Sequence, residues 1–253
     1  MIPWLERLSD LFPSRNLPQL AHEEPGGPIV ERRFALGTSA LLAASFLLGL
    51  PRRAGAASRL SFQDVVQRMG ELAKPMIQDP DRNEDEYLFH IASLAMTIKE
   101  FPPAQFGEPF KTMWGAMSHR GSGIAVIQWR MEPNTMYQAH NHPGYSGMSV
   151  GIRGDCRIRN FDYVKPPEFG SKSTFVVRET QDSILRQGFA TSIMSTTRDN
   201  IHELHAGPDG IHAVDIITKV GADQGFSFLD IASKPLDPQR RTYEAAWGTT
   251  QGV

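Results

Sequence analysis

The spacing of hydrophobic positions divides the chain into a helical part and a strand-rich part. In residues 61–72, apolar side chains recur three and four positions apart, which predicts an amphipathic helix that Pro75 ends. Asn83, with Glu86 three positions later, forms a capping box that predicts the start of a second helix, and Pro102 follows its apolar stripe. We expect both helices to pack on the outside of the body that follows.

After about residue 120 the hydrophobic period becomes two, which is the period of half-buried β-strands. Clusters of Gly, Pro, Asn and Asp separate the apolar runs. Short strands at this spacing, with no helical pattern between them, favour an all-β sandwich or closed barrel. The expected strands are Gly123–Met131, Ser146–Ile152, Arg157–Tyr163, Ser173–Arg178, Ala190–Ser195, Ile201–Ala206 and Gly210–Thr218.

The segment before this body has the features of an export signal. Arg32-Arg33 precedes a run without charge from Phe34 to Leu50, and Arg52-Arg53 with a small-residue stretch follows it. This order is typical of a cleavable twin-arginine signal. The alternative is a retained membrane anchor, because an apolar run of this length is just long enough to span a bilayer. We therefore expect a periplasmic protein exported by the twin-arginine route, with membrane contact only if the signal is retained.

Charge and cysteine content restrict the partners and the chemistry. The 253 residues carry a formal net charge of −2 and no long basic run, so we expect no nucleic-acid partner. Cys156 is the single cysteine, which excludes an intramolecular disulfide and a CxxC metal site. A metal site in this chain must therefore use histidine, carboxylate or main-chain ligands.

His140-Asn141-His142 is the most informative motif in the sequence. On an extended strand the two imidazoles leave the same face, so both can reach one metal ion. A third ligand has to come from elsewhere, and the histidines near predicted strands are His202, His205 and His212. His202 and His205 differ by an odd number, so only one of them can point inward from a strand. We expect His205 and His212 to be polar or exposed barrel positions, and they remain alternatives to His202.

The order of these features resembles the two-motif arrangement of cupins, which are double-stranded β-helix barrels of the jelly-roll type. His140-Asn141-His142-Pro143-Gly144, the later turn at Gly154, Asn200-Ile201-His202 and Val214-Asp215-Ile216 resemble motifs of the thiol dioxygenases of the plant cysteine oxidase and cysteamine dioxygenase family. The resemblance covers about residues 80–220. It implies a cupin barrel preceded by a short helical segment.

The resemblance also implies a reaction and a ligand set. It implies one Fe²⁺ ion held by His140, His142 and His202, with Asp215 as an acidic catalytic residue near it, and oxidation by O₂ of a small thiol or an N-terminal cysteine to a sulfinate. Many cupins carry a glutamate ligand shortly after the HxH motif, and residues 144–148 hold no carboxylate here. Three imidazoles would equally suit Zn, Ni, Co or Cu.

Four further residues are candidates for the site. Tyr137 and Tyr145 flank the HxH motif, so they could line the pocket and act in catalysis. Arg130 and Arg159 could bind an anionic substrate. The segment Thr218–Ala222 departs from the family, because the family has a Pro-Pro-Tyr-like sequence there and these five positions of this chain hold no tyrosine.

The predicted organisation has four parts. Residues 1–56 form the extension with its signal, 57–118 the helical lead, 119–232 the barrel, and 233–253 a polar tail along the surface. The predicted function is an Fe²⁺-dependent thiol dioxygenase. The alternatives are a cupin metalloenzyme that acts on a non-thiol substrate and a non-enzymatic periplasmic cupin that binds a metal or a small ligand.

Overall fold

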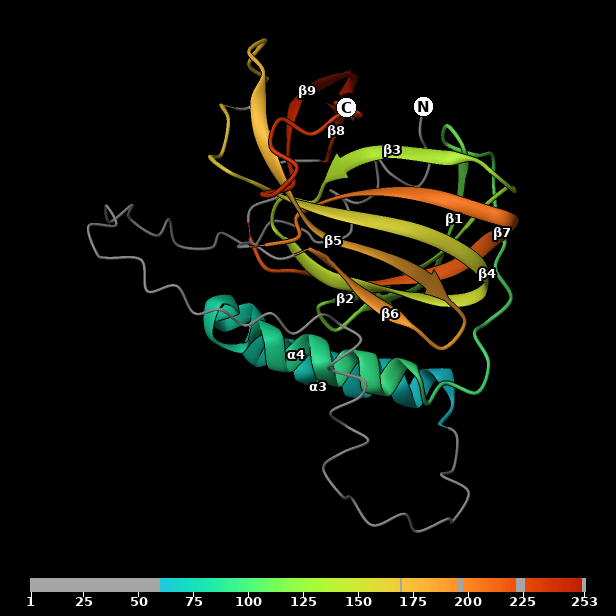
Figure 1. Ribbon diagram of the computed structural model, residues 1–253. Coiled ribbons are helices and arrows are strands. Elements are labelled where there is room, and N and C mark those ends of the chain that lie inside the picture. Colours follow the sequence, from blue (N-terminus) through green and yellow to red (C-terminus); the bar gives the residue numbers. More distant parts are fainter. Residues whose placement is uncertain (1–59, 169, 195–197, 222–225, 252–253) are drawn as a thin grey trace.

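The computed structural model describes residues 60–168, 170–194, 198–221 and 226–251. The predicted export signal lies outside these residues. Among the described residues, no helix combines the length and apolar character needed to cross a bilayer. The described chain contains two helices followed by nine strands (Figure 1), which confirms the prediction of an all-β body with a short helical lead.

The helical lead consists of α3 (Phe62–Gln78) and α4 (Pro80–Ala95). Ser61 caps α3 by accepting a hydrogen bond from the Asp64 main-chain N–H. Pro75 was predicted to end α3, but the helix continues past it to Gln78. Met76, in this last turn, is fully buried. The capping box at Asn83 is not the start of α4 either, since the helix begins at Pro80 and Asn83 lies inside it.

Both helices lie along one side of the strands, below them in Figure 1. Their buried side chains, such as Val65, Met69 and Ile91, pack against Val126 and Val214 on the outer face of the sheet. These contacts remove large apolar surfaces from water, which is the main stabilisation available to a layer of this kind. The prediction that the helices cover the outside of the barrel is therefore confirmed.

The strands pair antiparallel in the order β1-β2-β7-β3-β8-β9-β5-β4-β6, and a further β4–β7 pairing closes the ring. Two of them, β4 and β7, are long enough to belong to both halves of the barrel. The bounds are β1 Met113–Gly121, β2 Ile124–Met131, β3 Met136–Asn141, β4 Tyr145–Tyr163, β5 Phe175–Arg186, β6 Ala190–Met194, β7 Ile201–Lys219, β8 Ser227–Ile231 and β9 Thr242–Gln251.

The long strands replace two pairs of predicted short ones. Gly154 was expected to be a turn between two strands, and so was the segment Gly207–Gly210. Both are bends inside β4 and β7, which stay paired across them with shifts of register. Gly154 has φ +75°, and a Cβ atom there would lie 2.1 Å from the Gly210 carbonyl oxygen. Only glycine allows the two strands to approach so closely at this corner.

The predicted strands omit β3 (Met136–Asn141), although the HxH motif within it was expected to be extended, and they omit three further strands. The first, β1, begins at Met113, inside the segment assigned to the helical lead. The others are β8 and β9, and β9 lies in the segment expected to run along the surface as a tail. That expectation is wrong for Thr242–Gln251, because this strand pairs with both β5 and β8 and buries Ala245.

A second core lies inside the barrel. Side chains from β2, β3, β4, β7 and β8 meet there, among them Trp129, Tyr137, Ile158, Leu204 and Phe228. All of these are buried in the structure. His140 of β3 and His202 of β7 lie beside this core, since the His140 ring is 5.9 Å from the Phe228 ring and 4.4 Å from the His202 ring.

Candidate metal centre

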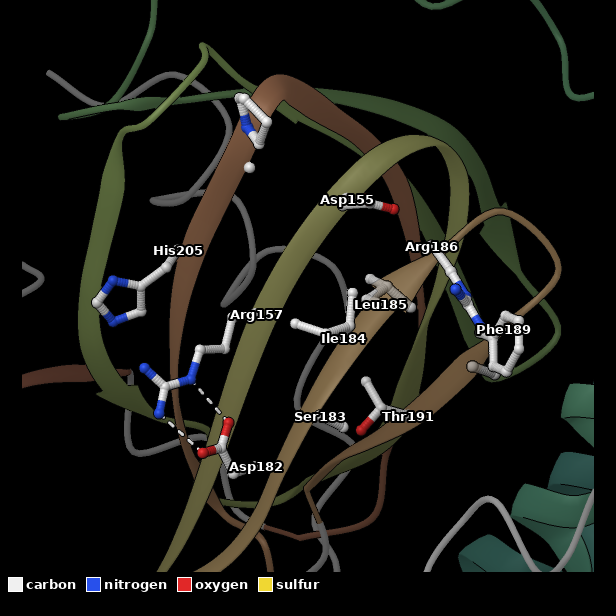
Figure 2. A pocket seen from close by; sticks show the side chains of 13 residues that line it. Asp155, Arg157, Asp182, Ser183, Ile184, Leu185, Arg186, Phe189, Thr191 and His205 are labelled. Carbon is white, nitrogen blue, oxygen red and sulfur yellow. Dashed lines mark hydrogen bonds and ion pairs between the residues drawn. The ribbon is translucent and has the colours of Figure 1, made fainter.

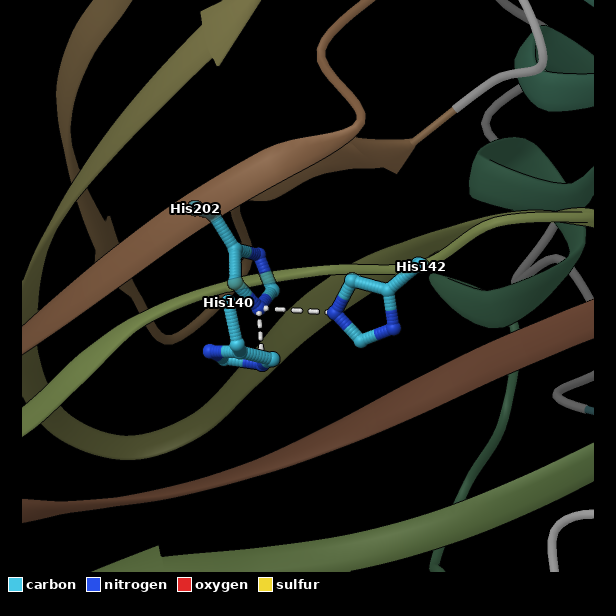
Figure 3. Close-up of side chains that lie close together, drawn as sticks. All are labelled: His140, His142 and His202. Atoms are coloured by element: carbon cyan, nitrogen blue, oxygen red, sulfur yellow. Dashed lines mark hydrogen bonds between the residues drawn. The ribbon is translucent and has the colours of Figure 1, made fainter. Parts of the chain in front are cut away.

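Three histidines from two neighbouring strands converge in the barrel (Figure 3). His140 on β3 lies directly opposite His202 on β7 in the antiparallel register. His142 follows the end of β3. Its main-chain N–H donates to the Asn200 carbonyl oxygen at 3.1 Å, which continues the pairing between β3 and β7. The structure thus brings together His140, His142 and His202, the three ligands that the resemblance implies.

The distances between the ring nitrogens suit one shared ion. His202 Nε2 lies 2.9 Å from His140 Nε2 and 3.2 Å from His142 Nε2. Two nitrogens that each lie about 2.1 Å from one ion, at a right angle to each other, are about 3.0 Å apart. Among the described residues, the cluster of close donor groups consists of these three imidazoles and contains no carboxylate. The donor set therefore fits a metal ion bound on one face by three neutral nitrogen ligands.

The interior keeps these imidazoles neutral. Burial lowers the pKa of His140 to about 4, and it lowers the pKa of His142 and His202 well below the usual range. Neutral imidazole offers a lone pair to a metal, whereas imidazolium does not. The His140 Nδ1 atom lies 2.9 Å from the Gln138 carbonyl oxygen, so it carries the proton there and leaves Nε2 free as the ligand atom.

An aromatic wall stands beside His140. The Tyr137 ring meets the His140 ring edge to face at 5.0 Å between centroids. Phe226 and Phe228 lie at 6.0 and 5.9 Å from the same ring. The sequence indicated Tyr137 as a site residue but gave no sign of Phe226 or Phe228. The predicted strands ended before β8, so the hydrophobic pattern did not predict that Phe226 and Phe228 lie at the site.

Asp215 and Tyr145 lie outside the cluster of three histidines. The Asp215 side chain faces the barrel interior, where its Oδ1 accepts hydrogen bonds from Trp129 Nε1 and Ser149 Oγ, both at 2.6 Å. It forms no part of the histidine cluster. Tyr145 is buried at the start of β4, and its main-chain N–H donates to the His142 carbonyl oxygen.

The structure does not bring the two candidate arginines to the histidines. Arg130 is exposed and lies over the Phe106 and Trp114 rings. Arg159 forms ion pairs with Glu179 and Glu203. In the β4–β7 register it lies opposite Glu203, next to the position where Asn160 lies opposite His202. Successive strand residues face opposite sides, so the Arg159 guanidinium lies on the face away from His202.

The two alternative histidines are also placed elsewhere. His205 lies 3.2 Å from the Glu203 carboxylate and is partly exposed. His212 Nε2 lies 2.9 Å from Gln128 Oε1, and burial lowers its pKa. Neither belongs to the cluster of close donor groups.

A separate hollow of about 740 Å³ lies on the outside of β4, β5 and β6 (Figure 2). The Arg157 guanidinium binds Asp182 there through two hydrogen bonds of 2.8 Å, and Phe189 lies against Arg186. None of the three clustered histidines lines this hollow. The chemistry of the histidine centre therefore does not extend to it.

Asn200 holds the main chain of His142 from both sides. Its Oδ1 accepts from the His142 N–H at 3.3 Å, and its Nδ2 donates to the His142 carbonyl oxygen at 3.0 Å. We expect Asn200→Ala to lower metal affinity by about tenfold, the smaller end of what indirect support for a ligand contributes. Asn200→Asp keeps the acceptor and should lose less. Calorimetric titration with Zn²⁺ measures both, and an affinity unchanged in Asn200→Ala would show that β3 holds His142 without this residue.

The partly buried Asp215 carboxyl makes stability depend on pH. Burial raises its pKa to about 6, above the value near 3.9 of an unfolded chain. The folded state therefore binds the proton more tightly, and stability falls as pH rises from about 4 to 6. Asp215→Asn can keep both hydrogen bonds without the charge. Relative to the parent, we expect the metal-free variant to gain about 2 kcal/mol between pH 4 and 7 in urea unfolding.

Asp182→Asn is the matched control for this pH dependence. The Arg157 hydrogen bonds lower the pKa of Asp182, so its carboxylate stabilises the fold at neutral pH and loses that contribution in acid. Asp182→Asn should therefore lose stability relative to the parent as pH rises, the opposite sign. If the free energies of unfolding of Asp215→Asn and the parent changed in parallel from pH 4 to 7, the raised pKa of Asp215 would be contradicted.

The fold and the site define a class of protein. A closed antiparallel barrel, in which HxH on one strand meets a third histidine on its neighbour, is the architecture of a cupin with a candidate metal centre. The sequence matches none of the protein-family models compared with it. It likewise matches no curated protein.

Several solved structures align with about half of the chain. KdgF from Halomonas sp. is 10% identical, with 46% of this chain and 87% of that chain covered and a TM-score of 0.34. An RmlC-like cupin from Shewanella frigidimarina is 12% identical, with 48% and 86% covered and a TM-score of 0.34. An oxalate oxidase is 11% identical, with 53% of this chain and 63% of that chain, less than two thirds, covered and a TM-score of 0.37.

Proposed function

We propose that this protein is a mononuclear Fe²⁺ cupin dioxygenase that oxidises a thiol, RSH + O₂ → RSO₂H, to a sulfinate. The observation that carries the proposal is the carboxylate-free set of three converging imidazoles. Neutral ligands leave the charge of a dipositive ion uncompensated, which favours a substrate that binds as an anion. A thiol with a lowered pKa is such a substrate.

The residues of the chain prepare this site in distinct ways. His140, His142 and His202 would hold the ion on one face and leave its other positions to the reactants. The aromatic wall of Tyr137, Phe226 and Phe228 lowers the polarity beside His140 and limits the access of water. When bound, the ferrous ion supplies Lewis acidity toward the thiol and redox chemistry toward O₂.

Asp215 is the proposed proton acceptor of the site. Its pKa is raised to about 6, so it is largely ionised at neutral pH and can still take up a proton. Its Oδ1 is held by Trp129 and Ser149, which leaves Oδ2 outside these two hydrogen bonds. A thiol that enters as the neutral acid has to release one proton, and this carboxylate can receive it. Tyr145, buried next to the turn that carries His142, is proposed to shape the pocket.

One observation favours a second function, a cupin that binds a metal or small ligand without turnover. The segment after Asp215 has no tyrosine in Thr218–Ala222, where the thiol dioxygenases carry one. A site without that hydroxyl could bind the same ion and act on a non-thiol substrate or not react. Imidazole ligands also suit Zn, Ni, Co and Cu. The identity of the bound metal therefore helps to distinguish these functions.

We further propose that the protein acts in the periplasm after twin-arginine export, on a small thiol or an exposed N-terminal cysteine. The support is the Arg32-Arg33 pair and the apolar run that follows it. Twin-arginine export carries folded proteins, which suits a protein that acquires its metal before export. Fractionation of cells that produce the full chain, with and without Arg32→Lys and Arg33→Lys, tests this part.

The reaction is tested with the full chain reconstituted with Fe²⁺ without oxygen. O₂ uptake and product mass are then followed over a panel of thiols. Incorporation of both atoms of ¹⁸O₂ into a sulfinate supports the dioxygenase. Stoichiometric iron without turnover of any thiol would overturn it in favour of the binding protein.

A further inference from the structure

One ring nitrogen of His202 is buried beside the candidate metal centre without a hydrogen-bond partner. The Nε2 atom of this ring faces the other two histidines, whereas Nδ1 lies on the far side of the ring (Figure 3). Nδ1 is buried, and it has no hydrogen-bond partner among the described residues. His140 differs, because its Nδ1 lies 2.9 Å from the Gln138 carbonyl oxygen. A buried polar atom without a partner in a folded protein calls for an explanation.

A bound metal would make His202 Nδ1 a hydrogen-bond donor. A neutral imidazole carries one proton, so a ring that binds an ion through Nε2 holds its proton at Nδ1. A buried N–H that has lost its hydration and finds no acceptor is unfavourable, and this loss would weaken metal binding. The centre therefore needs an acceptor beside His202 Nδ1.

Asn160 is the polar side chain that strand pairing places beside His202. The two residues lie directly opposite each other in the antiparallel β4–β7 register, and the next pair on this face is the apolar Ile158 and Leu204. Residues in directly opposite positions share one face, with Cβ atoms about 4.5–5.5 Å apart, so the amide can reach the imidazole. Both residues are buried, Asn160 at 0% and His202 at 2% exposure.

Gln181 favours the orientation of the Asn160 amide that such a bond requires. It lies opposite Asn160 on the other side of β4, in β5. Its Nε2 donates to Ser183 Oγ and Thr191 Oγ1, both at 2.8 Å, which uses both N–H groups of that amide. Gln181 can therefore offer Asn160 an acceptor, Oε1, and no further donor. An Asn160 amide that donates through Nδ2 to Gln181 presents its Oδ1 to His202.

We propose that Asn160 is a positioning residue of the metal centre, whose Oδ1 accepts a hydrogen bond from His202 Nδ1–H when His202 binds the ion. The bond forms once the ion fixes the proton at Nδ1, and rotation about the Asn160 side-chain bonds brings the oxygen to it. Such an acceptor fixes the orientation of the His202 ring and makes Nε2 a stronger ligand. This inference rests on the metal centre of the proposed function and is independent of the reaction that the centre catalyses.

The test measures the Zn²⁺ affinity of the full chain by competition with a chelating dye. Asn160→Leu removes the acceptor at similar volume, and Asn160→Asp supplies a stronger one. Gln128→Leu is the matched control, because Gln128 is a buried amide that contacts His212, a histidine outside the cluster. The second readout is the His202 Nδ1–H signal in NMR spectra of the Zn²⁺-loaded protein labelled with ¹⁵N-histidine, which reports the hydrogen bond itself.

We expect Asn160→Leu to bind Zn²⁺ about 10- to 100-fold more weakly, the usual loss when indirect support for a ligand is removed. Asn160→Asp should bind at least as tightly as the parent and move the His202 Nδ1–H signal downfield, because a carboxylate is the stronger acceptor. Gln128→Leu should stay within about twofold of the parent affinity, since it contacts no ligand.

Two affinity results would overturn the inference and leave the metal centre standing. They are the parent affinity in Asn160→Leu, and a loss in Asn160→Asp as large as that in Asn160→Leu. An Nδ1–H signal that does not move in Asn160→Asp would also overturn it, even if Asn160→Leu does not fold. A parent chain that binds no Zn²⁺ would instead overturn the metal centre and this inference together.

Discussion

Replacing His202 by alanine should abolish stoichiometric metal binding. The His202 Nε2 atom is the middle one of the three, within 2.9 and 3.2 Å of the other two ligand atoms. Without it, only two imidazoles remain, both from the end of β3, and the described residues offer no close carboxylate as a substitute. Loss of an indirect support costs about 10- to 100-fold in affinity, so loss of a ligand itself should exceed that. Metal content after desalting, measured by mass spectrometry, gives the result.

His205→Ala is the matched control for this prediction. It removes an imidazole three positions further along the same strand, where the ring lies near Glu203 and partly in solvent. We expect the parent metal content in this variant. A stoichiometric ion in His202→Ala, or its loss in His205→Ala, would mean that the third ligand has been assigned to the wrong histidine.

Replacing Glu179 by glutamine should destabilise the fold by about 3 kcal/mol. The Glu179 side chain is 3% exposed and accepts hydrogen bonds from Arg159, Arg241 and Tyr243. Arg241 directly precedes β9 and Tyr243 is its second residue, so this carboxylate connects the last strand to β4 and β5. A neutral amide removes the countercharge of Arg241 and leaves Arg159, whose side chain is 15% exposed, with Glu203 as its remaining carboxylate partner. Urea unfolding of the metal-free full chain measures the loss.

Asp182→Asn provides the comparison for Glu179→Gln, because both carboxylates lie on β5 and bind an arginine of β4. The Arg157–Asp182 pair is 49% and 33% exposed, and water screens its attraction. Its loss should cost less than about 1 kcal/mol at neutral pH. Equal effects of the two substitutions would show that the Glu179 cluster is no more than a surface ion pair.

Much of the site could be predicted from local sequence. A period of two places His140 and His142 on one face of a strand whatever the rest of the fold does. The parity of the spacing between His202 and His205 restricts the inward position to one of them. The choice of His202 came from the resemblance, and the structure brings it opposite His140. Antiparallel register, which no local pattern specifies, is what makes the three rings meet.

The rest depends on contacts between distant segments. Gly154 and Gly210 have the local signature of turns, and they become bends within β4 and β7 because the two strands pair on both sides of the corner. The sequence after Ser233 is polar and contains proline, and the strand that forms there, β9, pairs with β5 and β8, next to the contacts of Glu179 with Arg241 and Tyr243. The arginine candidates failed for a similar reason. Strand periodicity could not indicate that Arg159 faces a buried carboxylate.

We propose that three histidines and no protein carboxylate hold one metal ion in this barrel. X-ray absorption of the full chain, reconstituted with Fe²⁺ without oxygen and desalted, tests it most directly, because imidazole rings give a countable multiple-scattering signal. We predict one iron per chain with three imidazoles at about 2.1 Å. A chain that retains no iron, or a bound iron with two or fewer imidazoles, would contradict the account.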